Sequence, residues 1–161
     1  MRCVHIRIGV LAVLLGTGLG ACSRDTSAPA PAAPSAPQET VSRVGDVTIR
    51  ASVMQTSTLA ETVAAQYGIA RDDRTVMLLV AVRQGPEAEE TALPARIAAT
   101  ATDLRGQRHE IAMRELRSGD LLDYVGTMEI ALPDTLRFDL DITREGGATS
   151  TMQFNREFYP R

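Results

Sequence analysis

Apolar and polar residues alternate strictly near the end of the chain, between positions 136 and 143. In order, these residues are Leu136, Arg137, Phe138, Asp139, Leu140, Asp141, Ile142 and Thr143. Successive side chains of a β-strand point to opposite faces, so the alternation predicts a strand with one face in a core and the other in solvent. Such a strand needs neighbouring strands and a second layer to cover its apolar face, which already favours a layered β fold.

Six further segments have the composition of strands, and turn-forming residues separate most of them. The predicted strands are 47–53, 75–83, 94–103, 109–116, 121–130 and 149–158. Segment 75–83 is apolar on both faces, which predicts a central strand that is covered twice. About seven strands predict a mainly β fold, an antiparallel β-sandwich of immunoglobulin-like type over residues 44–161.

One short helix is expected between the first two strands of the domain. Thr58 and Glu61 have the spacing of a capping box, which would start the helix at that point. Leu59, Val63 and Tyr67 follow at helical spacing and predict its apolar face. Gly68 is expected to end it, because glycine readily adopts the left-handed conformation of a helix C-terminus.

The first 21 residues have the features of a lipoprotein signal peptide. Arg2 and Arg7 precede an uncharged apolar run over residues 8–19, which is too short for a stable membrane span. The run ends in Leu19-Gly20-Ala21-Cys22, which resembles the lipobox of bacterial lipoproteins, where the cysteine is acylated. Cys22 is therefore the predicted lipidation site, although an ordinary signal peptide cleaved elsewhere is the alternative.

Residues 22–43 are expected to form the lipidated cysteine and a tether. Four of the eight prolines of the chain lie here, among alanine and serine. Such a segment has too little apolar bulk for a core, and proline favours an extended conformation that could reach roughly 60 Å. Ser23 follows the cysteine, which favours an outer-membrane lipoprotein facing the periplasm over retention at the inner membrane.

Charge and cysteine content restrict the possible partners. The formal net charge is −3 over 161 residues, and all 17 basic residues are arginine, without a basic block. This distribution argues against nucleic-acid binding. The two cysteines are Cys3, which the signal peptide would remove, and Cys22, so no disulfide is expected in the mature domain.

Four short motifs resemble the bacterial family called domain of unknown function 4426. They are residues 66–71 (QYGIAR), 101–107 (ATDLRGQ), 116–120 (LRSGD) and 154–160 (FNREFYP). The resemblance covers nearly all of 44–161 and implies a small periplasmic domain of Gram-negative bacteria, without an assigned activity or functional residues. The lipobox and the proline-rich tether depart from the plain signal peptide that is more usual in this family.

Few residues suggest catalysis. Asp139 and Asp141 would lie on one strand face about 6.6–6.8 Å apart, where they could hold a cation or act as acid and base. A solvated face paired with arginines such as Arg137 or Arg156 is the simpler interpretation. His109 is the only histidine downstream of Cys22, so a serine-histidine-aspartate triad would have to use it.

These observations predict a non-catalytic binding or envelope-stabilising module, with no cofactor and no metal. Its expected partners are the membrane, through Cys22, and a periplasmic protein. The candidate contact loop spans residues 67–74, where an aromatic residue and four charged residues gather. Its members are Tyr67, Arg71, Asp72, Asp73 and Arg74. A periplasmic hydrolase using His109 or the Asp139/Asp141 face, and a carrier of a small apolar ligand between the sheets, are the alternatives.

Overall fold

The computed structural model describes residues 38–161 of the chain. The predicted signal peptide, Cys22 and most of the expected tether lie outside these residues. In chain order the elements are β1 (Glu39–Val44), β2 (Val47–Gln55), η1 (Thr56–Thr58), α1 (Glu61–Tyr67), β3 (Thr75–Gln84), η2 (Glu87–Glu89), β4 (Thr91–Ala92), β5 (Ala95–Thr102), β6 (Arg108–Ile111), β7 (Arg114–Ser118), β8 (Leu121–Glu129), β9 (Asp134–Arg144) and β10 (Thr149–Phe158). Within this part of the chain, no helix has the length and apolar character needed to cross a membrane.

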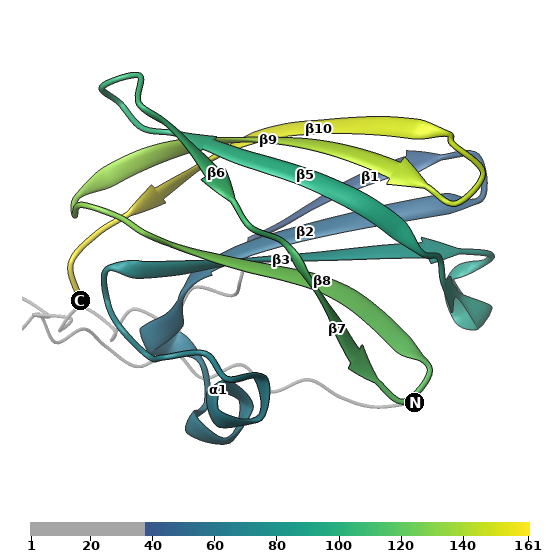
Figure 1. Cartoon of the computed structure of the whole chain (residues 1–161), viewed down its shortest axis with the longest axis horizontal. Helices are drawn as coiled ribbons and strands as arrows, with labels where there is room; N and C mark the ends of the chain where they lie inside the picture. The colour runs from purple at the N-terminus through teal and green to yellow at the C-terminus, as the bar shows by residue number, and fades with distance from the viewer. Residues whose placement is uncertain (1–37) are drawn as a thin grey trace, which may run out of the picture. The chain divides into compact units, whose positions relative to one another are not determined.

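The strands form two antiparallel sheets that face each other (Figure 1). The first sheet has the order β1-β2-β3-β8-β7, with β4 paired to β3, and the second has the order β10-β9-β5-β6. The predicted mainly β antiparallel sandwich with one short α-helix is therefore confirmed. Ten strands are present in the described residues instead of about seven, because one strand lies upstream of residue 44, one is very short and one predicted strand is divided.

The sandwich begins earlier than expected, inside the segment assigned to the tether. β1 starts at Glu39 and pairs with β2 in a hairpin, from Glu39 opposite Ser52 to Val44 opposite Val47. Residues 39–43 therefore belong to the first sheet. Thr40 and Val41 are β-branched, and the strand lies at the sheet edge with mostly exposed side chains, so it shows no strong apolar alternation.

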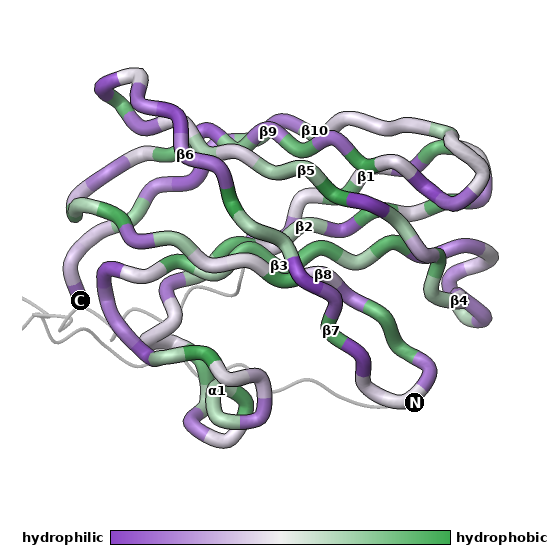
Figure 2. The backbone as a smooth tube through the Cα atoms, in the orientation of Figure 1, coloured by the Kyte–Doolittle hydropathy of each residue, from purple (hydrophilic) through white to green (hydrophobic). Residues whose placement is uncertain are grey.

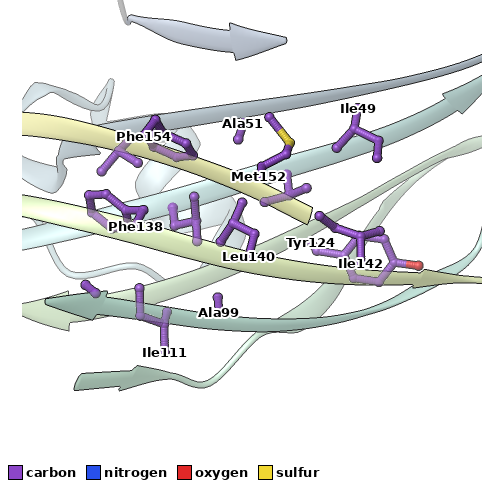
Figure 3. Packing of buried hydrophobic residues seen from close by; sticks show 14 of the residues in the cluster. Ile49, Ala51, Ala99, Ile111, Tyr124, Phe138, Leu140, Ile142, Met152 and Phe154 are labelled. Atoms are coloured by element: carbon purple, nitrogen blue, oxygen red, sulfur yellow. The ribbon is translucent and has the colours of Figure 1, made fainter. Parts of the chain in front are cut away.

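The core lies between the two sheets, and β9 supplies its centre (Figure 3). Leu136, Phe138, Leu140 and Ile142 are all buried, as the alternation predicted. The Phe138 ring stacks on Phe154 of β10, with ring centroids 5.4 Å apart. Figure 2 shows hydrophobic residues alternating with hydrophilic ones along several strands, and mostly hydrophilic residues in the turn between β5 and β6.

Helix α1 covers part of the outer face of the first sheet and makes β3 a doubly covered strand. Leu78 of β3 belongs to the core between the sheets, whereas Met77 packs in a second cluster with Ala64 of the helix. The prediction that segment 75–83 is a strand covered on both faces is thus confirmed for the part of β3 that lies beneath the helix. Gly68 ends the helix with a φ of 62° and a ψ of 36°, the left-handed conformation expected of it.

The predicted capping box is wrong. The Thr58 hydroxyl donates a hydrogen bond to the Gln55 carbonyl at 2.7 Å, within the turn η1, and it does not cap the helix. Ala60 occupies the N-cap position, so the helix begins later than the Thr58 spacing suggested. Val63, which was expected on the apolar face, is exposed, and Ala64 is the buried residue.

The predicted strand 109–116 is divided between the sheets. β6 pairs with β5 in the second sheet, and after two residues the chain continues as β7, which pairs with β8 in the first sheet (Figure 1). Gly126 of β8 lies beneath this crossing. A Cβ atom there would come within 2.6 Å of Ile111 and 2.8 Å of the Met113 sulfur. Glycine at this position therefore lets the crossing chain lie close to β8.

Candidate functional site

Asp139 and Asp141 of β9 lie on the outer face of the second sheet, and their surroundings differ. Asp139 accepts hydrogen bonds from Gln153 at 2.5 Å and from the Arg137 guanidinium at 3.2 Å. The Gln153 bond, together with Arg137, lowers the Asp139 pKa below its ordinary value despite partial burial. Asp141 is exposed. The pairing with Arg137 that was expected of a solvated face is present.

Arg156, the other arginine expected to pair with these aspartates, has a different role. Its guanidinium donates to the Thr40 hydroxyl at 2.6 Å and to the Gln38 carbonyl at 3.0 Å. It also lies over the Phe154 ring, 4.8 Å from the ring centroid. Arg156 therefore joins β10 to β1 and ties together the two sheets along that side of the sandwich.

His109 follows the turn that Asp103 stabilises. One Asp103 carboxylate oxygen accepts the backbone N–H groups of Arg105 and Gln107, at 2.9 and 2.8 Å. His109 Nε2 lies 4.0 Å from the other carboxylate oxygen, and the imidazole is partly exposed. Burial acts to raise the Asp103 pKa, but the bonds from Gln107 and Arg105 outweigh it and lower the pKa. The Asp103 carboxylate thus stabilises the turn, and His109 lies beside it.

The candidate contact loop makes several bonds to its own domain. Arg71 donates to the Ser57 carbonyl at 2.9 Å, and the Asp72 carbonyl accepts both the Ser57 N–H and the Thr56 hydroxyl. The Asp72 carboxylate also accepts the Arg74 N–H at 2.6 Å. Arg71 and Asp72 therefore hold the loop against η1.

The remaining members of that loop differ in exposure. Asp73 and Arg74 have exposed side chains, and the Asp73 carbonyl accepts a bond from the Gln55 side chain at 2.8 Å. Tyr67 is half-buried and packs against the cluster beneath the helix, and its carbonyl accepts a bond from Arg114 at 2.5 Å. A partner could reach only part of the predicted loop surface. Within residues 38–161, no group of three or more His, Cys, Asp or Glu side chains is arranged to hold a metal ion.

The structure reveals a groove that was not predicted from the sequence. It has a volume of about 580 Å³ and opens where β5 faces β7 and β8. Its apolar floor is formed by Ile97, Met113 and Tyr124, which pack against the main core. Charged residues surround this floor: Arg96, Glu115, Arg144 and Glu145.

The groove exists because β6 is shorter than β5. β6 pairs only with residues 99–102, opposite Ile111 to Arg108, and then leaves the second sheet. Residues 95–98 of β5 are paired on one side with β9, and no strand of the described chain pairs with their other side. Ile97 faces the core side but remains partly exposed, because the groove begins there.

Tyr124 closes one end of this open edge. Its hydroxyl accepts a hydrogen bond from the Ala95 N–H at 2.7 Å, so a side chain from the first sheet meets the backbone of the second. The Pro94 carbonyl, by contrast, accepts the Glu145 N–H on the opposite side. Because backbone groups alternate along a strand, the N–H and C=O of Ile97 face the groove like the Ala95 N–H.

The sequence carried a weak indication of this groove. Ile111 and Met113 are two residues apart, but the next apolar residue is Leu116, so the period of two breaks at the crossing. Met113, Tyr124 and Arg144 come from three different strands or connections, and their meeting depends on the pairing of the sheets. No local pattern would have brought them together.

Comparison with known proteins identifies the family and the fold. The model of the family "Domain of unknown function (DUF4426)" matches residues 41–161. A crystal structure of a DUF4426 family protein from Pseudomonas aeruginosa PAO1 is 24% identical, with a TM-score of 0.65, and the match covers 76% of this chain and 96% of that one.

Two structures of FetP from uropathogenic Escherichia coli strain F11 are also similar. The copper-bound form of a variant is 11% identical, with a TM-score of 0.50 and coverage of 76% of this chain and 95% of that chain. FetP as isolated after expression in the periplasm is 12% identical, with a TM-score of 0.49 and coverage of 76% and 93%. No curated protein matches significantly. The family match over most of the described residues shows that the chain belongs to the DUF4426 family.

Proposed function

We propose that this chain is a periplasm-facing lipoprotein, anchored in the outer membrane through Cys22, that acts as a non-catalytic binding module. The lipobox and the proline-rich segment support the anchor and the tether. A tethered domain stays near the membrane while it searches the surrounding volume, which raises its effective concentration for a partner. The contact surface that we assign to it is the groove beside β5.

The observation that carries this proposal is that the groove holds polar groups without partners beside an apolar floor. Arg144 Nε is buried and makes no hydrogen bond within the described residues. Ile97 presents its backbone to the same space. Buried polar groups are normally satisfied, so a bound molecule that supplies acceptors would gain those bonds. Grooves that combine apolar area with a few directed polar groups are typical binding sites.

Binding fits the described chain better than hydrolysis, because the candidate catalytic residues have other surroundings. His109, Asp139 and Asp141 do not belong to the groove lining. Asp103, the carboxylate nearest His109, already accepts two backbone N–H groups of its turn. A carrier of a small apolar ligand would use the same groove, and its open, charged rim favours a polar partner instead.

Site-specific photocrosslinking in intact envelopes would test the contact surface. A photoreactive phenylalanine analogue would replace Glu115 at the groove, Asp73 in the loop and Asp141 on the outer sheet face, in separate strains. We expect a discrete adduct from position 115 and none from position 141. An adduct from position 73 alone would move the contact surface to the loop, and the absence of adducts at every position would contradict the binding proposal.

A further inference from the structure

The open edge of β5 has the geometry of an unfinished sheet. Residues 95–98 pair with β9 on one side only, and β6 stops at Ile111, opposite Ala99. A strand that extended β6 in the same direction would lie beside residues 98 to 95 of β5. The chain itself does not fill this place, because it crosses to the first sheet over Gly126. A segment of about four residues, near 13 Å long, would complete the sheet.

Three hydrogen-bond donors belong to residues that line the groove where such a segment would lie. The Ile97 N–H faces it by the alternation of the strand. The Tyr124 hydroxyl accepts the Ala95 N–H, and its own proton has no acceptor within residues 38–161. Arg144 Nε is buried without a partner in the same part of the chain. The Ile97 carbonyl is an acceptor, so Ile97 can exchange two backbone hydrogen bonds with a peptide. The Tyr124 hydroxyl and Arg144 Nε then remain as donors for one further acceptor of the ligand.

The charges around the groove indicate that this acceptor is a carboxylate. Glu115 is paired with Arg117, its carboxylate accepting two guanidinium bonds at 2.8 and 3.2 Å. Arg96 and Arg144 have no carboxylate within 4.0 Å in the described chain. A carboxylate beside Arg144 would form a charge-assisted bond. Glu115 and Glu145 also line the groove, so a single carboxylate fits it better than a run of acidic residues.

We propose that the groove binds an extended peptide segment with one carboxylate, which adds as a strand beside residues 95–98, in line with β6. This proposal rests on the binding function proposed above and specifies its ligand. Main-chain bonds to Ile97 would supply part of the affinity, and apolar side chains of the peptide would cover the partly exposed side chains of Ile97 and Met113. The groove has a volume of about 580 Å³, and only residues 95–98 of β5 lack a neighbour on this side, so a single short segment fits better than the edge of a second copy.

The test uses the full-length chain in detergent and a library of random decapeptides displayed on phage. We expect selected peptides to be rich in β-branched residues and to share one Asp or Glu. Binding of a selected peptide, measured by isothermal titration, should weaken at least about tenfold for Arg144→Gln and for Ile97→Pro. Ile97→Val, which keeps the N–H, is the matched control and should bind like the wild type.

Two further measurements separate strand addition from other modes of binding. N-methylation of alternate residues of the peptide should abolish binding in one register and spare it in the other, because only alternate N–H groups face β5. Replacing the acidic residue of the peptide by its amide should reproduce the Arg144→Gln loss. The protein variants Arg144→Gln and Ile97→Pro must keep the thermal unfolding transition of the wild type. If Ile97→Pro does not, binding of the methylated peptides to the wild type decides whether the peptide adds as a strand.

Failure of this inference is distinguishable from failure of the proposed function. Peptides that bind equally to Ile97→Pro and tolerate methylation in both registers would overturn strand addition. A selection that yields no peptide would also overturn it, while a crosslink from position 115 would still support a groove that binds another partner. A size-exclusion shift to a dimer that Ile97→Pro abolishes would show that a second copy is the occupant and would overturn the peptide.

Discussion

The Tyr124 hydroxyl accepts a hydrogen bond from the Ala95 N–H at 2.7 Å and thereby connects the two sheets at the groove. Tyr124 is buried, and it is the side chain of β8 that reaches the first residue of β5. The opposite side of the sandwich is joined by Arg156, which binds Thr40 of β1. One side is thus joined by a charged side chain between edge strands, and the other by the Tyr124 hydroxyl and by the chain that crosses from β6 to β7.

Tyr124→Phe should loosen the start of β5 without unfolding the domain. The substitution keeps the ring in the core but leaves the Ala95 N–H without its acceptor. We expect a loss of about 1 kcal/mol in the free energy of unfolding, the usual net value of one hydrogen bond. Hydrogen exchange should accelerate at Ala95, while Phe138 in the centre of β9 stays protected. Unchanged exchange at Ala95 would contradict this assignment.

Gly126→Ala should disturb the crossing between the sheets. The added Cβ would meet Ile111 at 2.6 Å and the Met113 sulfur at 2.8 Å, so the crossing chain must shift. Overpacking of this kind costs about 1–3 kcal/mol. Met113→Ala, made in the Gly126→Ala variant, should recover part of the lost free energy of unfolding. Chemical denaturation of the two single variants and the double variant measures the coupling between the two positions. Strictly additive losses would show that Met113 does not resist the new methyl group.

The faces of the central strands could be predicted from the sequence, because burial imposes a period of two. Leu136, Phe138 and Ile142 were assigned to the core by alternation alone, and all are buried. β1 was missed because an edge strand with exposed side chains needs no alternation. The division of segment 109–116 was missed because Gly126, which permits it, lies on another strand. Local sequence patterns predict which face of a strand is buried, whereas the path of the chain between the two sheets depends on contacts between residues far apart in the sequence.

The candidate site shows the same limit more strongly. The loop 67–74 gathers four charged residues, which predicts a contact surface, yet Arg71 and Asp72 bind to the neighbouring turn η1. Charge density alone does not distinguish a surface for partners from a loop that is held by its own bonds. The groove, in contrast, is defined by an interrupted strand pairing and by Arg144, whose unpaired nitrogen becomes visible only in three dimensions.

Cys22→Ser should abolish acylation of the chain. Leu19-Gly20-Ala21-Cys22, which resembles a lipobox, predicts two acyl chains on the thiol-linked glycerol and one on the new amine. Several chains anchor a protein stably where one does not. Labelling with radioactive palmitate should disappear in this variant. Cys3→Ser, which alters the other cysteine, should leave the labelling intact. Persistent label in Cys22→Ser would show that the lipobox was misidentified.

Phe138→Ala and Arg137→Ala should differ sharply in stability, although the residues are adjacent. Phe138 is fully buried and stacked on Phe154, and emptying such a site costs about 3–5 kcal/mol. Arg137 is more than half exposed, and its loss should cost under about 0.5 kcal/mol. Urea denaturation of both variants makes the comparison. Similar losses at the two positions would mean that the alternation does not separate core from surface.

Acidification should destabilise the turn that Asp103 holds. The pKa of Asp103 in the folded chain is lower than its ordinary value of 3.8, so the folded state binds fewer protons there than the unfolded state. The resulting stabilisation is fully present above about pH 5 and is lost as the pH falls through the folded pKa. Thermal unfolding between pH 7 and pH 2 should therefore show a decline below about pH 4 to which Asp103 contributes.

Asp103→Asn and Asp103→Ala separate the charge from the hydrogen bonds. The amide oxygen of asparagine can still accept the N–H groups of Arg105 and Gln107, which both bind one carboxylate oxygen. Asp103→Asn should therefore keep the turn but show a shallower decline in stability on acidification, because it has no proton to bind. Asp103→Ala should lose stability at every pH, since the two N–H groups lose their acceptor. If Asp103→Asn declines as steeply as the wild type, other carboxylates account for the acid sensitivity of the domain.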